Sequence, residues 1–489
     1  MTNPTGPYTP SWNSLRTHPT PQWFQEAKFG IYAHWGVYSV PGFRGPEGTQ
    51  DVSWYGRNMY LEGTPQYEHH VKTYGGPAKF GYKDFIPQFK GEKFDPDEWA
   101  ELFVQAGARF AGPVGEHHDG FCMWDTYYTP CSAARLGPRR DVVGALEKSI
   151  RRQGLKFLVA LHNAENWWFY PHWLSQYDVA DRRYAALYGE AHNLDGPGTG
   201  PDFVSAFFDQ ARPSHDFLIY WLGKIIEVIE RYGPDLLWFD FGLRDMPDHY
   251  KQAALAHYFN WAAASGREVT VTAKRHDLAS AGAVVDLEAG RMPGLTHHQW
   301  LTDTSVDDLK AWGYMPGMPY KSTTSLVHYL VDNVCKNGHL LLNVGPRPDG
   351  TIPEAAADVL RGLGRWLAVN GESIYGTTTW TTHGEGPTSF TSGGSGNEGE
   401  VAGFSAHDVR YAVKDNVLYA TCLGWPGAEI TLAALNHFYP SEIESITLLG
   451  DGQPLPWRLG RAGLTIATPT ERSGEHAYVF KLVRRPPFG

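Results

Sequence analysis

The stretch "HDFLIYWLGKIIEVIERYGPDLLWFDFG" (residues 215–242) carries a helix pattern that leads directly into a strand pattern. Apolar residues recur at helical spacing over 215–233, which predicts a long amphipathic helix. The run that follows, 234–242, is short and apolar around Asp240, which is typical of a buried strand. Helices that alternate with buried strands imply a parallel sheet with right-handed crossovers.

The same pairing of helix and strand recurs along most of the chain. Further helices are predicted over 95–108, 141–154 and 353–371, and further strand runs over 29–36, 109–120, 155–168, 268–274, 283–288 and 339–345. An open doubly wound sheet would normally show a GxGxxG or P-loop motif after its first strand, and neither occurs. About seven or eight such units therefore predict an α/β fold built as a (β/α)8-like barrel, which we assign to residues 1–385.

The texture of the chain changes after about residue 385. A Gly/Ser-rich loop at 388–400 precedes several short runs that alternate apolar and polar residues without helical stretches. This pattern predicts a small antiparallel β-sandwich over residues 386–489.

Composition narrows the classes of partner. The net charge of −11 argues against nucleic acid or an anionic membrane surface as the main partner. No apolar run is long enough to span a membrane, and the first twenty residues show no signal-peptide pattern. We therefore expect a cytoplasmic protein, or a secreted one whose signal has been removed. The 18 Trp, 26 Tyr and 24 Phe favour carbohydrate modestly, because aromatic rings stack on the C–H faces of sugars.

The four cysteines are scattered and form no CxxC motif. Free, mostly buried thiols are the simplest interpretation. A pairing of Cys122 with Cys131 stays open at this level.

Polar residues cluster where the predicted strands end. They include His34, the "EHHD" run at 116–119, His162 with Glu165, Trp238 with Asp240, Lys274 with Arg275, and Glu288. In a barrel of this kind the active site lies at the carboxyl ends of the strands. These ends therefore form the candidate active site.

Three chemistries could use such a rim. Metal-assisted hydrolysis is disfavoured, because adjacent histidines such as His117 and His118 point to opposite faces of a strand and no HExxH or Cys/His zinc pattern occurs. Acyl transfer lacks a GxSxG elbow. Glycoside hydrolysis needs two carboxylates and no cofactor or metal. Asp240 is the candidate nucleophile, and Glu288 is the candidate acid/base with Asp286 as its competitor.

Several longer motifs point to one family. They are "WFQEAKFGIYAHWGVYSVPGF" (23–43), "SWYGRNM" (53–59), "EHHDGFCMWDT" (116–126), "YGPDLLWFD" (232–240), "AWGY" (311–314), "LLLNVGPRPDGTIPE" (340–354) and "NGESIYGT" (370–377). In this order they resemble the α-L-fucosidases, a family of retaining glycosidases with a (β/α)8 barrel and a C-terminal β-sandwich.

The resemblance implies that Asp240 is the nucleophile of a retaining double displacement on terminal α-L-fucosyl linkages of glycans or glycosides. It implies a fucose pocket lined by His34, Trp54, His117, His118 and Trp238. Many members place the acid/base in a T-x-E segment, whereas this chain has "VVDLEAGRMP", in which we favour Glu288.

The chain departs from the family pattern at three places. Ser53 precedes Trp54 where some members have an acidic residue, and the third strand ends in "LHNAENW", which brings in His162 and Glu165 as binding candidates. Arg275, or Lys274 beside it, stands where some members put a basic residue near the sugar. The expected partner is a fucosylated oligosaccharide or glycoconjugate. A non-catalytic fucose-binding protein and a metal-dependent barrel hydrolase are the alternatives.

Overall fold

The computed structural model describes residues 6–46, 51–190, 212–274, 277–278, 282–399 and 403–485, so Arg275 lies outside the described residues. Eight parallel strands close into a barrel in sequence order, as predicted. They are β1 (Phe29–Ala33), β2 (Phe110–Glu116), β3 (Lys156–Leu161), β4 (Leu236–Phe239), β5 (Thr270–Lys274), β6 (Val284–Asp286), β7 (Trp300–Ser305) and β8 (Gly338–Val344). β1 pairs with both β2 and β8, which closes the barrel.

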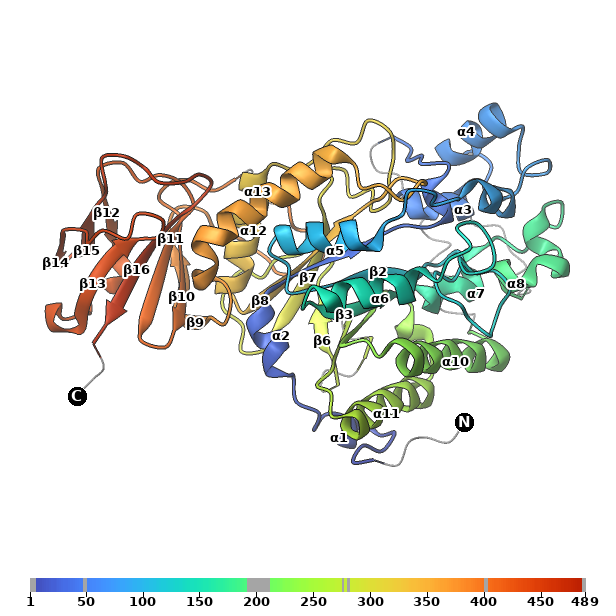
Figure 1. Cartoon of the computed structure of the whole chain (residues 1–489), viewed down its shortest axis with the longest axis horizontal. Coiled ribbons are helices and arrows are strands. Elements are labelled where there is room, and N and C mark those ends of the chain that lie inside the picture. Colours follow the sequence, from blue (N-terminus) through green and yellow to red (C-terminus); the bar gives the residue numbers. More distant parts are fainter. Residues whose placement is uncertain are drawn as a thin grey trace.

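Long helices cover the outside of the barrel (Figure 1). They are α5 (Pro96–Gln105), α6 (Val142–Arg152), α10 (His215–Tyr232), α11 (Asp248–Ser265), α12 (Thr323–Cys335) and α13 (Glu354–Asn370). α10 begins where the Ser214 side chain accepts a hydrogen bond from the Phe217 N–H, and it ends at Gly233, whose φ of +51° suits glycine. The other α-helices are α1 (Trp12–Leu15), α2 (Gln22–Ala27), α3 (Tyr55–Asn58), α4 (Pro65–Tyr74), α7 (Asn166–Phe169) and α8 (Ala185–Tyr188) in the described residues.

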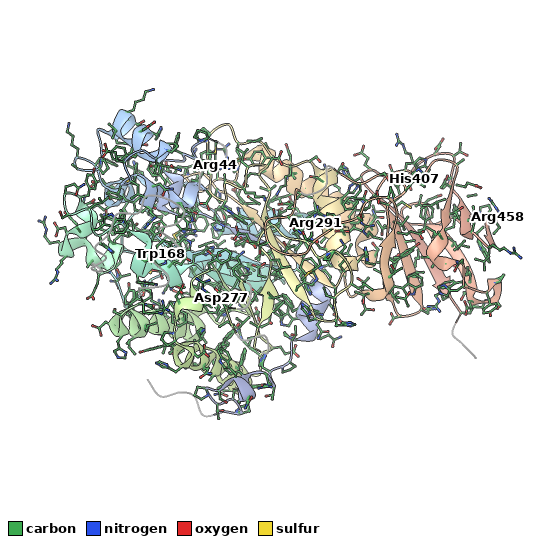
Figure 2. All side chains as sticks on the ribbon, turned by 180° about the vertical axis from the view of Figure 1, so that it is seen from behind. Arg44, Trp168, Asp277, Arg291, His407 and Arg458 are labelled. Atoms are coloured by element: carbon green, nitrogen blue, oxygen red, sulfur yellow. The ribbon has the colours of Figure 1, made fainter. Side chains whose placement is uncertain are left out.

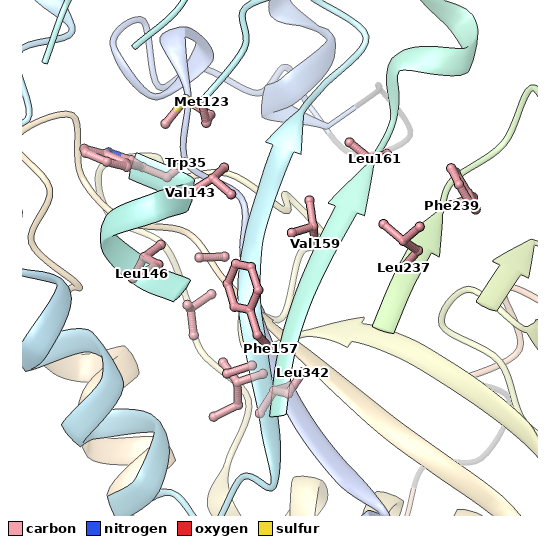
Figure 3. Packing of buried hydrophobic residues seen from close by; sticks show 14 of the residues in the cluster. Trp35, Met123, Val143, Leu146, Phe157, Val159, Leu161, Leu237, Phe239 and Leu342 are labelled. Carbon is pink, nitrogen blue, oxygen red and sulfur yellow. The ribbon is translucent and has the colours of Figure 1, made fainter. Parts of the chain in front are cut away.

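Apolar side chains fill the layer between the strands and the helices. Figure 3 shows Phe157 and Val159 of β3 beside Leu146 of α6, together with Leu237 of β4. These residues are fully or almost fully buried. This packing holds the strands in place, and it therefore fixes where their carboxyl ends lie.

β7 was not predicted as a strand. Its sequence "WLTDTS" has two apolar residues followed by four polar ones, yet all six residues are buried. The polar side chains find partners inside the barrel, as when the Tyr32 hydroxyl donates to Asp303 at 2.8 Å. A search for apolar runs therefore passes over this strand.

The C-terminal strands form two antiparallel sheets that share a hydrophobic core. One has the order β13-β16-β11-β10-β9 and the other β12-β15-β14. Their bounds are β9 (Thr378–Glu385), β10 (Val409–Lys414), β11 (Val417–Cys422), β12 (Glu429–Leu432), β13 (Ile443–Leu448), β14 (Trp457–Gly460), β15 (Gly463–Ala467) and β16 (Tyr478–Arg484). β9 precedes residue 386 but pairs with β10, so this sheet takes one strand from residues that the sequence analysis assigned to the barrel.

The C-terminal sheets sit at one end of the molecule, next to α12 and α13 (Figure 1). The Trp366 indole N–H of α13 donates to the Ala477 carbonyl at 3.0 Å, and Arg410 of β10 pairs with Asp332 of α12. All four cysteines are free thiols, Cys122 and Cys131 included. Within the ranges given above, no helix has both the length and the apolar character to cross a membrane.

Candidate active site

The carboxyl ends of the barrel strands surround a cavity of about 290 Å³. Its walls combine imidazoles, carboxylates and aromatic rings from most of the strands and from two loops. The lining residues are Tyr32, His34, Asp51, Ser53, Trp54, His117, His118, His162, Glu165, Trp168, Trp238, Asp240, Phe241, Glu288, Asp303 and Trp312. His34, Trp54, His117, His118, His162, Glu165, Trp238, Asp240 and Glu288 therefore lie at one cavity, whereas Glu116, Asp119 and Lys274 of the predicted rim do not line it.

His34 follows β1 and is oriented by an amide. Its Nδ1 lies 2.7 Å from the Asn343 side-chain oxygen, and the Asn343 NH₂ group donates to Ser305 and to the Trp312 carbonyl. Because those two bonds fix the amide orientation, Nδ1 of His34 carries the proton. The Nε2 atom is left as an acceptor.

His117 and His118 follow β2 and both line the cavity, although the alternation of side chains along a strand predicted opposite faces. The His117 ring stacks on His162 with 4.6 Å between centroids, whereas the His118 ring faces Trp54 edge-on at 5.4 Å. Nδ1 of His118 donates to the His162 carbonyl at 2.7 Å, so its Nε2 is also an acceptor.

Burial keeps these imidazoles neutral. It lowers the pKa of His34 to about 4, although the Asn343 bond opposes the shift. It lowers the pKa of His118 to about 3, against the opposing bond to the His162 carbonyl. The pKa values of His117 and His162 are also lowered well below the ordinary range, by burial and then by neighbouring imidazoles.

Three histidines from three strands also meet at one point. Nitrogen atoms of His34, His117 and His162 lie within 4.8 Å of one another, which is close enough for one metal ion. The sequence argument considered only adjacent histidines and missed this combination. Neutral imidazole suits both a metal ion and the hydroxyl groups of a sugar.

Asp240 follows β4 and is 7% exposed. Its Oδ2 lies 3.5 Å from Nε2 of His118 and 3.9 Å from Nε2 of His162. Burial raises the pKa of Asp240, and the Lys274 ammonium opposes that rise. Oε2 of Glu165 lies 3.7 Å from the same His118 nitrogen, so two carboxyl groups flank it.

Lys274, at the end of β5, is the fully buried cation of the site. Its Nζ lies 2.5 Å from Asp303, 3.2 Å from Asp286 and 3.3 Å from Glu288. Burial alone would lower the pKa of Lys274, but these carboxylates raise it well above the ordinary value. The sequence offered Lys274 or Arg275 as the basic residue near the sugar, and Arg275 lies outside the described residues.

The same contacts separate the two acid/base candidates. Asp286 is fully buried beside Lys274, whereas the Glu288 side chain is 33% exposed and lines the cavity. A general acid must reach the leaving group of a substrate. Of the two, Glu288 lines the cavity and Asp286 does not.

Tryptophans form the aromatic wall. Trp238 presents its ring to Lys274 at 4.7 Å, and its indole nitrogen is buried with no hydrogen-bond partner among the described residues. Nδ1 of His117 and Nδ1 of His162 are buried and unpartnered in the same way. Leaving such groups unpaired costs about 1–3 kcal/mol each.

Glu116, the first residue of the "EHHD" run, does not line the cavity. Its carboxylate accepts from Lys224 of α10 at 2.5 Å and from Asn163 at 3.0 Å. It therefore ties β2 to the helix layer instead of serving the site.

Sequence reasoning missed other lining residues: Tyr32, Asp51, Trp168, Asp303 and Trp312. Tyr32 and Asp303 lie within strands. The sequence signal that could have identified them as site residues is a polar residue inside a buried run. Asp51 sits two residues before Ser53, and its carboxylate accepts from the backbone N–H groups of Ser53 and Trp54. Burial raises the pKa of Asp51 to about 7.

Comparison with known proteins gives a consistent picture. Residues 1–372 match the α-L-fucosidase family, and residues 404–483 match the α-L-fucosidase C-terminal domain. Tissue α-L-fucosidase of Bos taurus is 30% identical over 490 residues, which cover 97% of this chain and 91% of that protein. Human plasma α-L-fucosidase is 32% identical over 482 residues, which cover 94% of this chain and 88% of that protein.

The barrel and the C-terminal sheets also match solved structures. The crystal structure of Thermotoga maritima α-fucosidase in complex with fucose superposes with a TM-score of 0.78 at 31% identity, and the match covers 97% of this chain and 100% of that one. The chain belongs to the α-L-fucosidase family of glycoside hydrolases.

Proposed function

We propose that the cavity hydrolyses terminal α-L-fucosyl linkages of fucosylated oligosaccharides or glycoconjugates with retention of configuration, using Asp240 as nucleophile and Glu288 as acid/base. The observation that carries the proposal is the meeting of these two carboxylates, from the ends of β4 and β6, at one cavity lined by imidazoles and indoles. Membership of the family and the fucose complex of the Thermotoga relative support fucose as the sugar.

The polar groups of the cavity suit a sugar with several ring hydroxyls. His34 and His118 present neutral Nε2 acceptors, while Trp238 presents a buried indole donor without a partner among the described residues. Hydroxyl groups both donate and accept, so they satisfy both kinds of atom. The C5 methyl group of fucose suits the aromatic surface of Trp54.

The reaction proceeds in two displacements. The Asp240 carboxylate attacks the anomeric carbon while Glu288 donates its proton to the glycosidic oxygen, and the bond between that oxygen and carbon breaks. Water then attacks the fucosyl–Asp240 ester as the Glu288 carboxylate takes a proton from it, which releases fucose and restores both groups. This geometry predicts carboxyl groups about 5–5.5 Å apart.

Two variants test these roles. Asp240→Ala should lower turnover of an aryl α-L-fucoside by about 10⁴-fold or more while the melting temperature shows a folded protein. Glu288→Ala should retain far more activity on substrates with good leaving groups than on natural linkages. Added azide should restore turnover of this variant, with fucosyl azide as the product. Full activity of Glu288→Ala on a natural linkage would contradict its assignment.

The cluster of His34, His117 and His162 favours one other function, a metal-dependent hydrolase. A direct comparison of aryl fucoside turnover before and after chelation, with metal content measured in both samples, separates the two. The proposed mechanism requires unchanged turnover, whereas loss on chelation and recovery on adding a metal would establish the alternative.

A further inference from the structure

A short segment between β9 and β10 lies along the backbone that carries Glu288. We call residues 394–398 the 394–398 segment. Three of its backbone N–H groups donate to carbonyl oxygens of residues 288–291: Gly396 to Glu288 at 2.8 Å, Glu398 to Ala289 at 2.9 Å and Gly394 to Arg291 at 3.1 Å. Figure 2 shows Arg291 near the junction of the barrel with the C-terminal sheets.

Asn397 adds a side-chain contact to this backbone pairing. Its amide oxygen accepts from the Arg291 N–H at 2.7 Å, and its NH₂ group donates to the Ser392 carbonyl at 3.0 Å. The two backbones approach closely, because a Cβ atom at Gly290 would lie 2.4 Å from the Gly394 carbonyl oxygen. The contact is therefore specific to this pair of segments.

Ala289, the residue after Glu288, has an unfavourable backbone. Its φ is +43°, a left-handed conformation that costs a non-glycine residue about 1–2 kcal/mol. Two hydrogen bonds hold it there: its N–H donates to the Asp303 carbonyl at 2.7 Å, and its carbonyl accepts from Glu398. One restraint comes from the barrel and the other from the 394–398 segment.

Glu398 fastens the 394–398 segment to the end of β7. Its side chain is 11% exposed, with Oε1 at 2.8 Å from Lys321 and Oε2 accepting from the Thr304 hydroxyl at 2.7 Å. Lys321 also donates to the Ser305 carbonyl at 2.8 Å. The 394–398 segment is thus anchored on the barrel itself, beside the strand that holds Asp303.

Glu288 depends on such backbone support more than Asp240 does. Its side chain is 33% exposed, compared with 10% for Asp240, so packing restrains it less. We propose that the 394–398 segment positions the acid/base Glu288 for proton transfer, with Asn397 and Glu398 as positioning residues. The proposal rests on the acid/base role of Glu288 proposed above.

The expected signature is a loss that depends on the leaving group. A poor leaving group needs a well-placed proton, whereas a good one departs without it. General acid catalysis contributes about 10²–10⁴-fold, so partial misplacement should cost about 10- to 100-fold on a natural linkage. A general loss of fold would instead lower activity on both kinds of substrate.

The test measures kcat/KM of Asn397→Ala on a fucosyl disaccharide and on a dinitrophenyl α-L-fucoside. We expect about a tenfold or greater loss on the disaccharide and less than about threefold on the aryl substrate. Asn397→Asp keeps the acceptor for the Arg291 N–H and should recover most of the loss. The matched control is Asn416→Ala, which removes an amide that bonds only the remote Arg484 carbonyl in the described contacts and should leave both rates unchanged.

Glu398→Gln is the second variant, because it keeps the side-chain shape but removes the charge that faces Lys321. It should show the same dependence on leaving group to a smaller degree, and its melting temperature reports whether it is folded. Equal losses on both substrates, or no loss in either variant, would overturn the positioning role.

Glu288→Ala, measured in parallel, separates this proposal from the one on which it rests. If Glu288→Ala shows the leaving-group dependence and Asn397→Ala does not, only the positioning role fails. If Glu288→Ala shows none, the acid/base assignment fails and the positioning role fails with it.

Discussion

Trp238 shows how a single atom can serve binding without serving stability. Its indole nitrogen is buried with no partner in the described part of the chain, so replacing it removes no hydrogen bond of the free protein. Trp238→Phe should lower the melting temperature, because the smaller ring leaves a cavity beside Lys274. Fucose should also inhibit about 3- to 10-fold more weakly, a loss of about 1 kcal/mol. Titration of an aryl fucosidase assay with fucose measures the inhibition constant, and equal inhibition would exclude a bond to this nitrogen.

Lys274 affects the electrostatic state of Asp240, the proposed nucleophile. Burial raises the pKa of Asp240 and the Lys274 ammonium limits that rise. Lys274→Met should therefore move the acidic limb of the kcat/KM profile to higher pH, because only ionised Asp240 attacks. It should also lower the free energy of unfolding by about 3–5 kcal/mol, since buried carboxylates lose their cation. An acidic limb that stays in place would show that Asp240 does not sense Lys274.

At this scale the sequence predicted residues that end strands better than residues within them. Asp240 and His34 stood out because polar groups directly after buried strands are conspicuous. Asp303 and Tyr32 lie within strands. The hydrogen bond between them, which satisfies their buried polar groups, forms only in the folded barrel. Asp51 comes from a loop whose approach to the cavity no periodicity encodes.

Among the elements, the connection after β2 combines two imidazoles that line the cavity with a carboxyl that is buried away from it. His117 and His118 face the cavity, whereas Asp119 is buried and accepts from the Tyr82 hydroxyl at 2.7 Å and from the Phe121 N–H at 3.1 Å. The sequence grouped these residues as one polar run. Their separation depends on packing against residues 82 and 121, which a local pattern does not contain.

Asp119 gives this connection a pH dependence of its own. Burial raises the pKa of Asp119 to about 7, against the opposing bonds from Tyr82 and Phe121. Since the folded pKa lies above the unfolded one, the carboxyl stabilises the fold at low pH, and that contribution is lost as pH rises through 7. As pH rises from about 5 to about 8, the free energy of unfolding of Asp119→Asn should therefore increase relative to that of the wild type. Urea unfolding at both pH values measures this, and a pH-independent difference would contradict the shift.

Strands and helices differ in how far their sequences reveal them. α10 has a serine cap, an apolar stripe and a terminal glycine, and its predicted bounds agree with the structure to within one residue. β7 has none of the usual strand signals, because its threonines and Asp303 are stabilised by contacts with other elements. Tertiary partners decide such a strand, and the sequence alone shows only an unusual polar run.

On the scale of the whole molecule, one buried carboxylate joins the barrel to the C-terminal sheets. Asp332 of α12 lies 2.8 Å from Lys336, 2.6 Å from Arg410 of β10 and 3.2 Å from Arg291. Burial would raise the pKa of Asp332, but these three cations lower it below the ordinary value. The junction therefore depends on a charge cluster as well as on apolar packing.

Removing this charge should weaken the junction. Asp332→Asn leaves buried cations without their counter-charge and should lower the free energy of unfolding by about 3–5 kcal/mol. Calorimetry should then show the C-terminal sheets melting separately from the barrel. A single transition at the wild-type temperature would mean that the cluster does not hold the two parts together.

The order of the two parts along the chain was predictable, but their contacts were not. The change of texture near residue 385 predicted the antiparallel C-terminal architecture, although β9 of that sheet precedes residue 386. Nothing in the Gly/Ser-rich run at 388–400 indicated that it returns to the barrel and pairs with residues 288–291. Such pairing joins segments about a hundred positions apart, and it depends on shape rather than on a motif.

The hydrogen bonds between residues 394–398 and the loop after β6 also limit how this protein can be recombined. A glycine-rich connection between two parts normally invites module exchange, because such linkers tolerate new lengths and partners. Here residues 394–398 of the connection are hydrogen-bonded to residues 288–291 of the barrel domain. Because β9 precedes these residues and pairs with β10, a single crossover point cannot both keep residues 394–398 with the barrel and exchange the whole C-terminal sheet.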